Sequence, residues 1–488
     1  MQSLQHSQEP DTRSALWSKR ITIALAVIWF FIFWRLVVHQ HSRFGTFNFD
    51  LGIFDQSIWL LSRGHNPLIT IRGLNVWGHH ANFMFYALVP FYWFGAGPNF
   101  LNMVMIASTA ACVWPIHKIA VHYLGQHFYG ALFAALFLWN PTTQFLMWET
   151  FHPDMMAMLP LFWAWWFMTQ RNWRFFTIAC VIAALWKEDV ALAIVIIGLF
   201  IAAFCHGERK LGWYTALAAF LWFQFVSKLF LGHFNHYDAY YNSWFGSLGD
   251  SVPQVAINLI KHPNLISDAL REKDAAIYSW NMLTPWGWLP LLAPFVLFFG
   301  VPQFLVNIFT IQTFVRDYRF HYAAVVLVAL TIATMVAIRT LGTSRGRRIL
   351  LVGFLAICGV RTGHEWGVGP LTKNYKSGFW FSENIAKEKA FNTALDLIPK
   401  NAGVSSSYHI GSHLAHRDHI YDWPNPFHLA NWGVANENPP NPLNVDYFIV
   451  ESDNLGESQG VFDDLITKNV FHVIFEREGV VVAQRTKP

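Results

Sequence analysis

Long apolar runs separated by short polar segments dominate the chain. The first run, residues 21–38, follows Arg13, Lys19 and Arg20 and approaches the roughly 20 apolar residues that a membrane span requires. No small-residue cleavage site follows it, so we interpret it as an uncleaved span and not as a signal peptide. The later runs lie near residues 100–116, 128–147, 155–169, 175–186, 190–205, 211–231, 276–312, 322–338 and 349–361. This pattern predicts a mainly α, polytopic membrane protein.

The polar segments divide the chain into three predicted parts. Residues 1–20 form a cytoplasmic N-terminal segment, and residues 21–361 form a transmembrane helical domain with a long first outer loop, 40–98. Residues 362–488 are polar and alternate between helix-like and strand-like runs, which predicts a small soluble extracytoplasmic α/β domain. Within it we expect a helix at Glu383–Ile398, strands at Val445–Glu451 and Val470–Glu476, and a hairpin turn at Glu478–Gly479.

Basic residues between the apolar runs predict the orientation, because cytoplasmic loops are enriched in Lys and Arg. The cations expected on the cytoplasmic side are Lys118, Arg171, Arg174, Arg209, Lys210, Arg339, Arg345, Arg347 and Arg348. For all these cations to lie on one side, the chain must cross the membrane an even number of times between them. Residues 79–98 therefore should not cross the membrane, and 276–312 should cross twice or re-enter. We expect the break within 276–312 at Gly300–Pro302. The predicted location is the plasma (inner) membrane, with a cytoplasmic N-terminus.

Composition and charge narrow the function classes. Hydrophobic residues make up 54% of the chain and charged residues only 13%, against about 25% charged in a soluble domain. The net charge of +4 and the lack of a basic stripe with interleaved aromatics argue against nucleic acid as a partner. The four cysteines lie in or beside apolar runs without paired short spacing, so neither a disulfide framework nor a thiolate metal site is expected.

Two aspartates, Asp50 and Asp55, follow the first span closely. The residues around them place one apolar stripe on a helix, which we expect to lie on the membrane surface: Leu51, Phe54, Ile58 and Leu61. Asp50 at its start is either an N-cap or a general base or metal ligand at the lipid–water boundary. Asp55 lies about 140° further round the helix, which argues against a metal held by both.

The segment Trp148–Asp154 carries a second polar group between two spans. Pro153 is expected to begin the next helix, with Asp154 in its first turn, where a negative charge is favourable. Capping alone explains Asp154. In the alternative, Glu149, His152 and Asp154 hang over the same outer cavity as Asp50.

Charged residues of a third group, Lys187, Glu188 and Asp189, interrupt an apolar hairpin. Such charges are costly in lipid, so they face water as a solvated turn or face a polar cavity. Arginine is suited to bidentate phosphate recognition, although each outer arginine is also explained as a snorkelling surface residue. The outer arginines are Arg43, Arg63, Arg72, Arg316 and Arg319, and Arg319-Phe320-His321-Tyr322, at the start of a span, is the best placed.

Histidines offer the chemistry of a metal site. His79 and His80 close the Gly73–Gly78 turn region, and together with His152 and an acidic group they could bind a divalent metal such as Mg or Mn. No recognised metal spacing is present, so no cofactor is assigned. The chain also lacks a P-loop, a Gly-rich dinucleotide turn and a nucleophile elbow.

An ordered series of motifs resembles a known superfamily over most of the chain. The motifs are Phe49–Gln56, Gly78–His80, Phe151–Asp154, Lys187–Leu192, Arg319–Tyr322 and the tail segment Ser405–Trp423. They resemble the polytopic glycosyltransferases of the GT-C superfamily, and within it a bacterial membrane-protein family known only as a domain of unknown function. The resemblance implies a GT-C-like transmembrane helical bundle carrying the small α/β domain.

The resemblance also implies roles for individual residues. In GT-C enzymes an acidic residue of the first outer loop acts as the catalytic base, a position that Asp50 matches. A second acidic site in the next outer loop matches Asp154, and Asp55 is the further catalytic candidate. The superfamily's donors are typically sugars on polyprenyl phosphate, which implies that Arg319, Lys187 or Arg72 holds the donor phosphate. The pair His79–His80 departs from the better-studied families, where a Pro-rich turn is expected.

We therefore expect an inverting membrane glycosyltransferase that uses a polyprenyl-phosphate-linked donor and a glycan, lipid or protein acceptor. The residues expected to line its substrate cavity are His79, His80, Glu149, His152, Glu188, Asp189, His321 and Tyr322. The alternatives are a transporter or flippase for a lipid or small polar solute, and a non-catalytic scaffold. Against transport stand the lack of an inverted repeat and the clustering of carboxylates at one membrane face.

Overall fold

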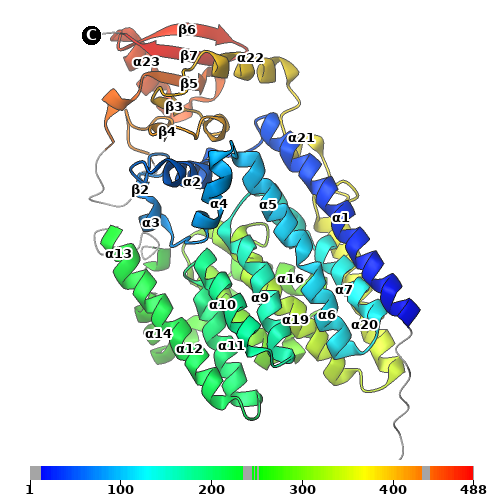
Figure 1. The fold of residues 1–488 in the computed structure, drawn as a ribbon. Helices are drawn as coiled ribbons and strands as arrows, with labels where there is room; N and C mark the ends of the chain where they lie inside the picture. The colour runs from blue at the N-terminus through cyan, green and yellow to red at the C-terminus, as the bar shows by residue number, and fades with distance from the viewer. Residues whose placement is uncertain (1–11, 235–243, 247, 250–251, 431–439, 487–488) are drawn as a thin grey trace, which may run out of the picture.

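A helical bundle with a small α/β domain on one end makes up the fold (Figure 1). The computed structural model describes residues 12–234, 244–246, 248–249, 252–430 and 440–486. The helices as far as the bundle's end are α1 (Thr12–Ser42), α2 (Ile53–Arg63), α3 (Val76–His79), α4 (Phe85–Trp93), α5 (Pro98–Ala111), α6 (Val113–Leu124), α7 (His127–Trp139), α8 (Pro141–Trp148), α9 (Pro153–Thr169), α10 (Trp173–Trp186), α11 (Val190–Phe204), α12 (Arg209–Gln224), α13 (Leu231–Phe234), α14 (Val252–Lys261), α15 (Asn264–Arg271), α16 (Lys273–Leu283), α17 (Pro294–Leu297), α18 (Val301–Phe309), α19 (Ala324–Leu341) and α20 (Arg345–Trp366). The predicted mainly α, polytopic architecture is confirmed.

Five helical stretches of the described chain are long and apolar enough to cross a membrane. They are Arg13–Ser42, Pro98–Leu124, Arg209–Phe234, His321–Leu341 and Arg345–Trp366. The stretch containing α19 is the most deeply buried of the five, so α19 forms the centre of the bundle. The stretches containing α1 and α20 are mostly exposed, as expected of helices that face lipid.

The segment 276–312 breaks at a different place from the one predicted. Gly287 and Trp288 adopt left-handed backbone conformations, with φ of 60° and 59°, and they separate α16 from the apolar helix Pro294–Phe309. At Gly300 only a short 3₁₀ turn, Phe298–Gly300, separates α17 from α18, and the helical stretch continues through it, so the chain does not divide there into two halves as predicted. A Cβ at Gly300 would lie 2.6 Å from Cβ of Ala329, so this glycine permits close packing on α19. In residues 79–98, α4 has only nine residues and is too short to span a membrane.

Opposite ends of the bundle differ in charge. At one end Arg348 donates to the carbonyl of Leu124, Arg339 lies over the ring of Tyr123, and Lys118 lies over the ring of Trp166. This is the end where α1 begins; where α1 finishes, His41 stacks on His413 of the C-terminal domain. The cations predicted to be cytoplasmic thus gather away from that domain. Which end faces the cytoplasm stays a prediction.

The C-terminal domain is built on a five-stranded mixed sheet of order β4-β3-β5-β7-β6. Its elements are α21 (Ser377–Trp380), α22 (Ile385–Asp396), β3 (Val404–Ser406), β4 (Ile420–Asp422), β5 (Tyr447–Glu451), α23 (Gln459–Thr467), β6 (Phe471–Arg477) and β7 (Val480–Arg485). Strand β3 runs parallel to β4 and β5, whereas β7 runs antiparallel to β5 and β6. The predicted helix, both strands and the turn at Glu478–Gly479 are confirmed.

Helix α2 and the hairpin β1 (Leu68–Ile69) and β2 (Leu74–Asn75) lie between the bundle and the C-terminal domain (Figure 1). The predicted helix exists, but its expected position on the membrane surface is wrong. Ile53, Phe54 and Ile58 are at most 3% exposed, and Gln56 donates to the carbonyl of Arg417 in the C-terminal domain. The apolar stripe is therefore buried against protein instead of lipid.

Candidate active site

Asp50 occupies a strained backbone position just before α2. Its φ of 69° and ψ of −80° lie near the rarely populated γ-turn region, which costs about 1–3 kcal/mol for a residue with a side chain. The N-cap of α2 is Gly52, and no side chain caps the helix. The N-cap interpretation of Asp50 is therefore wrong, and its carboxylate is left available for another purpose.

The Asp50 carboxylate faces a cavity of about 600 Å³ at the junction of the bundle and the C-terminal domain. Its side chain is 41% exposed. Residues from both parts of the molecule line this cavity, which we call the junction cavity: Phe49, Asp50, Ile53, Arg72, His79, Trp244, Gln312, Phe314, Tyr322, Tyr408 and Asp422. The structure thus brings Asp50, Arg72, His79 and Tyr322 together as expected. A space of this size accommodates a small substrate group.

A buried cluster of Glu149, His152 and His321 lies behind Asp50. His152 Nε2 is 3.4 Å from Asp50 Oδ2, and its ring stacks on that of His321 with centroids 3.9 Å apart. His321 Nδ1 is 2.6 Å from Glu149 Oε1. Burial raises the pKa of Glu149 to about 8. Burial works against a charged His152, but the carboxylates of Glu149 and Asp50 outweigh it and raise the pKa of His152 to about 9.

This buried cluster also has the chemistry of a metal site. One ligand atom from each of Glu149, His152 and His321 lies within 4.8 Å of the others. Glu149 Oε2 is buried without a hydrogen-bond partner, and buried His152 Nε2 makes no hydrogen bond beyond its 3.4 Å ion pair with Asp50, which fits an additional ligand there. Two imidazoles with one carboxylate suit Zn²⁺ or Mn²⁺ better than Mg²⁺, and such an ion would supply positive charge next to Asp50. The expected set contained His152 and an acid, but His79 and His80 are not part of this cluster.

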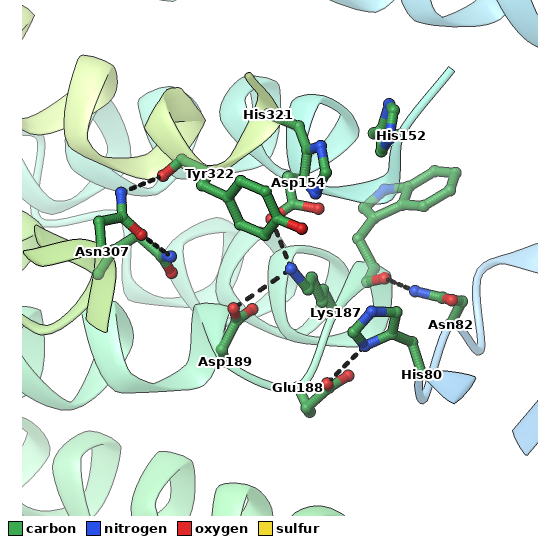
Figure 2. A network of polar contacts seen from close by, with 12 residues as sticks. His80, Asn82, His152, Asp154, Lys187, Glu188, Asp189, Asn307, His321 and Tyr322 are labelled. Atoms are coloured by element: carbon green, nitrogen blue, oxygen red, sulfur yellow. Dashed lines mark hydrogen bonds and ion pairs between the residues drawn. The ribbon is translucent and has the colours of Figure 1, made fainter. Parts of the chain in front are cut away.

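Lys187 forms a closed network of ion pairs beside the junction cavity (Figure 2). Its Nζ lies 2.8 Å from Asp154 Oδ1 and 3.4 Å from Asp189 Oδ2, and the lysine is buried. Against the effect of burial, these carboxylates raise the pKa of Lys187. In the same network Glu188 Oε1 is 2.8 Å from His80 Nδ1. The prediction of a solvated turn is wrong.

The network places two predicted site residues away from Asp50. Pro153 begins α9 with Asp154 in its first turn, as expected, but Asp154 pairs with Lys187 and does not line the junction cavity. Lys187, Glu188 and Asp189 instead line a smaller adjoining cavity of about 60 Å³. The two cavities share Trp244 and Tyr322. The expectation of one common cavity for Asp50 and Asp154 is therefore wrong, although their chambers adjoin.

Asp55 is enclosed on the other side of α2. Its carboxylate accepts from Tyr92 Oη at 2.7 Å and lies 3.1 Å from His416 Nε2, with 1% of the side chain exposed. Asp55 does not line the junction cavity. The prediction that the two aspartates would not share one face agrees with this geometry, whereas a catalytic role for Asp55 gains no support from it.

The predicted phosphate-binding arginines are divided between two cavities. Arg72 lines the junction cavity, with its guanidinium carbon 6.0 Å from the centre of the Phe49 ring. Arg319 binds Asp317, with Nη2 2.6 Å from Oδ2, and lines a neighbouring cavity of about 840 Å³. This neighbouring cavity meets the junction cavity at Phe314. Arg72, and not Arg319, is therefore the arginine that shares a chamber with Asp50.

Two residues of the C-terminal domain join the site without having been predicted individually. Tyr408 follows β3 and Asp422 ends β4, and both line the junction cavity. Burial raises the pKa of Asp422 to about 6, although Asn48 Nδ2 donates to its carboxylate at 3.2 Å. Both residues lie within the segment Ser405–Trp423, one of the motifs that resemble the GT-C superfamily. That motif pointed to the segment as a whole, but it assigned no role to either residue.

A family model described as "Predicted membrane protein (DUF2079)" matches residues 40–482. The chain belongs to this family. The match spans every site motif described above and all but the ends of the chain. A comparison with curated proteins gives no match.

Solved structures of ArnT from Cupriavidus metallidurans are similar to this chain. One is ArnT bound to undecaprenyl phosphate, with a TM-score of 0.53 and 12% identity over 95% of this chain and 97% of ArnT. The other is ArnT in the apo state, with a TM-score of 0.54 and 11% identity over 95% and 96% of the two chains. At this identity the likeness concerns the fold alone, and it confirms an ArnT-like helical bundle with a small C-terminal domain.

Proposed function

We propose that the chain is a membrane glycosyltransferase that moves a sugar from a polyprenyl-phosphate donor to an acceptor, with Asp50 as the catalytic base. The exposure of the Asp50 carboxylate is the observation that carries the proposal. Its side chain is 41% exposed and faces the junction cavity. The other carboxylates expected at the site, those of Asp55, Glu149, Asp154, Glu188 and Asp189, are between 1% and 24% exposed and lie in pairs.

The proposed reaction is a single displacement. The acceptor hydroxyl passes its proton to the Asp50 carboxylate while its oxygen forms a bond to the anomeric carbon. The bond between that carbon and the phosphate oxygen breaks, and its electron pair leaves with polyprenyl phosphate. Arg72 in the same cavity stabilises the negative charge of the leaving phosphate. His152, 3.4 Å from Asp50, positions the carboxylate.

An apolar groove between α10, α11 and α12 supports a lipid-linked donor. It has a volume of about 370 Å³, and its lining includes Val181, Leu185, Ile194 and Trp222. Leu185 and Trp222 of the groove are close in sequence to Lys187 and Phe223 of the small cavity that adjoins the junction cavity, so neighbouring residues of the same segments line the two spaces. An isoprenoid tail in this groove would leave its phosphate near the end of the bundle that carries Asp50. The ArnT structure with undecaprenyl phosphate shows a related fold binding such a lipid.

Transport is less well supported than transfer. The paired charges described above lie at helix ends, where α3 ends, where α9 begins and where α10 meets α11, and not along the middle of a bundle helix. Helix α19, at that centre, contains no charged residue from Ala324 to Ile338. A solute path through the bundle would be expected to expose polar groups there.

The test is donor turnover by the full chain in nanodiscs. Undecaprenyl-phosphate-linked glucose, mannose or arabinose would be supplied with an extract of membrane glycans and lipids, and release of undecaprenyl phosphate would be measured by mass spectrometry. We expect Asp50→Asn to lower the release rate by about 10²–10⁴-fold. Asp55→Asn, the matched replacement five residues away, should change it by less than about tenfold.

Two results would contradict the proposal. One is an Asp50→Asn variant as active as the wild type. The other is wild-type protein that moves a labelled donor lipid across the bilayer of proteoliposomes without releasing undecaprenyl phosphate, which would identify a flippase.

A further inference from the structure

A second polar cavity lies in the C-terminal domain, directly beside the junction cavity. Its volume is about 550 Å³, and we call it the sheet-edge cavity. Tyr408 lines both cavities, so the two cavities adjoin at that ring. All described residues that line the sheet-edge cavity come from 407–461, so this cavity belongs to the C-terminal domain and not to the bundle.

The position of this cavity follows from the topology of the sheet. After β3 the chain continues to β4 on one side, whereas β5 lies on the other side of β3. The loops that leave β3 and β5 therefore diverge and leave a crevice between them. In open α/β sheets ligands bind in such crevices at the carboxyl ends of the strands. Ser407 after β3, Trp423 after β4 and Glu451 at the end of β5 all line the sheet-edge cavity.

The lining combines aromatic faces with carboxylates. Trp423 Nε1 donates to Ser458 Oγ at 2.7 Å, which fixes the orientation of the indole, and Tyr408 is 42% exposed. Glu451 Oε1 lies 2.9 Å from Lys387 Nζ, so its carboxylate is also fixed. Glu457 adds a second carboxylate. Aromatic rings pack against the C–H faces of sugar rings, and carboxylates accept hydrogen bonds from hydroxyl groups.

The charge of the lining favours one class of ligand. Among the described residues that line the sheet-edge cavity none is lysine or arginine; two are glutamates, of which Glu451 pairs with Lys387, and two are histidines, His409 and His428. A phosphate or carboxylate group would find no guanidinium or ammonium group among these residues, while an uncharged saccharide would find acceptors for its hydroxyls.

We propose that the sheet-edge cavity binds the acceptor and that the acceptor is an uncharged saccharide chain. The inference rests on the proposed function, because it assigns the acceptor of that reaction. A saccharide that stacks on Trp423 would extend past Tyr408 and present its terminal hydroxyl to Asp50. The C-terminal domain then selects the acceptor, and the bundle supplies the base and the donor.

Binding by the full chain in nanodiscs tests this proposal without any need for turnover. The probes are N,N′-diacetylchitobiose and maltotriose, with 3′-sialyllactose as the anionic control, and saturation-transfer difference NMR measures their affinity. We expect the two neutral sugars to bind and Trp423→Ala to weaken them by about threefold to tenfold. Glu457→Gln should weaken them also. His472→Ala, exposed on β6 at the far edge of the sheet, is the matched control and should bind as the wild type does.

Further variants separate binding from folding and from catalysis. Trp423 packs on Phe448, so Trp423→Ala could also disturb the fold. Trp423→Phe keeps an aromatic face and should retain binding. Because this binding assay needs no turnover, loss of catalysis in Asp50→Asn and loss of acceptor binding in Trp423→Ala are measured separately. The proposal is overturned if the wild type binds neither neutral sugar, if 3′-sialyllactose or a peptide binds more tightly, or if Trp423→Ala and Glu457→Gln both keep full affinity.

Discussion

Asp50 and Asp55 lie five residues apart and each has a histidine beside it, yet they differ in backbone conformation and in exposure. Asp50 sits in a strained turn with 41% of its side chain exposed to a cavity. Asp55 lies in a regular helix with 1% of its side chain exposed, and its carboxylate is bound by Tyr92 and His416. Exposure likewise separates Arg72, which is partly exposed and lines the junction cavity, from the buried Lys187.

This contrast shows two uses of charge at one end of a membrane bundle. Buried charges in pairs hold their helices and loops together, and breaking such a pair is costly because the remaining charge is left without compensation. Charges that face a cavity keep their ability to bind or to accept a proton. Replacements in the closed group should therefore change stability, and replacements in the open group should change turnover.

The largest effect is expected from Lys187→Met, in the closed group. It leaves Asp154 buried without its partner and should lower the free energy of unfolding by about 3–5 kcal/mol. Denaturant titration of the protein in detergent measures this. Lys468→Met, which removes an exposed pair with Asp464, should cost less than about 1 kcal/mol. Equal costs for the two variants would remove the distinction between closed and exposed pairs.

In the open group, Arg72→Gln should lower donor turnover by about 10²–10³-fold, because it removes the cation proposed to stabilise the leaving phosphate. Initial rates of undecaprenyl phosphate release measure this. Arg319→Gln is the matched control, since Arg319 binds Asp317 in the neighbouring cavity, and it should change the rate by less than about threefold. If Arg319→Gln lowered the rate more than Arg72→Gln, the residue that binds the donor phosphate would be Arg319 and not Arg72.

Asp422 should make stability depend on pH. Its pKa in the folded protein, about 6, is above the ordinary value of 3.8, so the folded state retains a proton that the unfolded chain releases. The stability that comes from this retained proton is fully present below about pH 4 and is lost as the pH rises through about 6. Asp422→Asn should abolish the decline and be more stable than the wild type at pH 7 by at most about 3 kcal/mol.

Thermal unfolding of wild type and Asp422→Asn between pH 4 and pH 7 measures this dependence. Asp418→Asn replaces an exposed carboxylate four residues away and is the control. If the stabilities of the wild type and of Asp422→Asn changed in parallel with pH, the carboxyl group of Asp422 would not cause the pH dependence.

The smallest effect concerns the strain at Asp50. Glycine adopts a φ of 69° without penalty, whereas alanine retains the strain of the side chain. Asp50→Gly should therefore be more stable than Asp50→Ala by about 1 kcal/mol, while both lose turnover. Thermal unfolding of the two variants makes the comparison. A more stable alanine variant would mean that the turn relaxes when the carboxylate is removed.

Much of the fold could be predicted because it depends on local patterns. Apolar runs gave the helices of the bundle, and alternation with a Glu-Gly turn gave the hairpin of β6 and β7. The stripe on α2 correctly predicted a helix, but a stripe does not say whether lipid or protein covers it. Similarly, Gly300 was predicted to break the apolar stretch, whereas in the structure it permits close packing on Ala329. Ala329 is distant in sequence, so this contact could not be predicted from the local pattern.

The candidate site was harder to predict because it combines distant segments. A single half-exposed aspartate near the first span was identifiable from its position, and so were the charged turns around it. Which charges would pair was not, since the partners Lys187 and Asp154 are 33 residues apart and meet only in the packed bundle. Asp422 reaches the junction cavity from a domain that follows the bundle by many residues.

Strand β7 is the last strand of the chain to be synthesised, and this affects when the sheet of the C-terminal domain can be completed. Strand β7 lies between β5 and β6, so the sheet stays divided until residues 480–485 have been made. That sheet supplies Tyr408 and Asp422 to the junction cavity. A nascent chain can therefore insert the helices of its bundle before the strand that joins the two parts of this sheet exists. The junction cavity acquires its complete supporting sheet only after translation has passed the entire bundle.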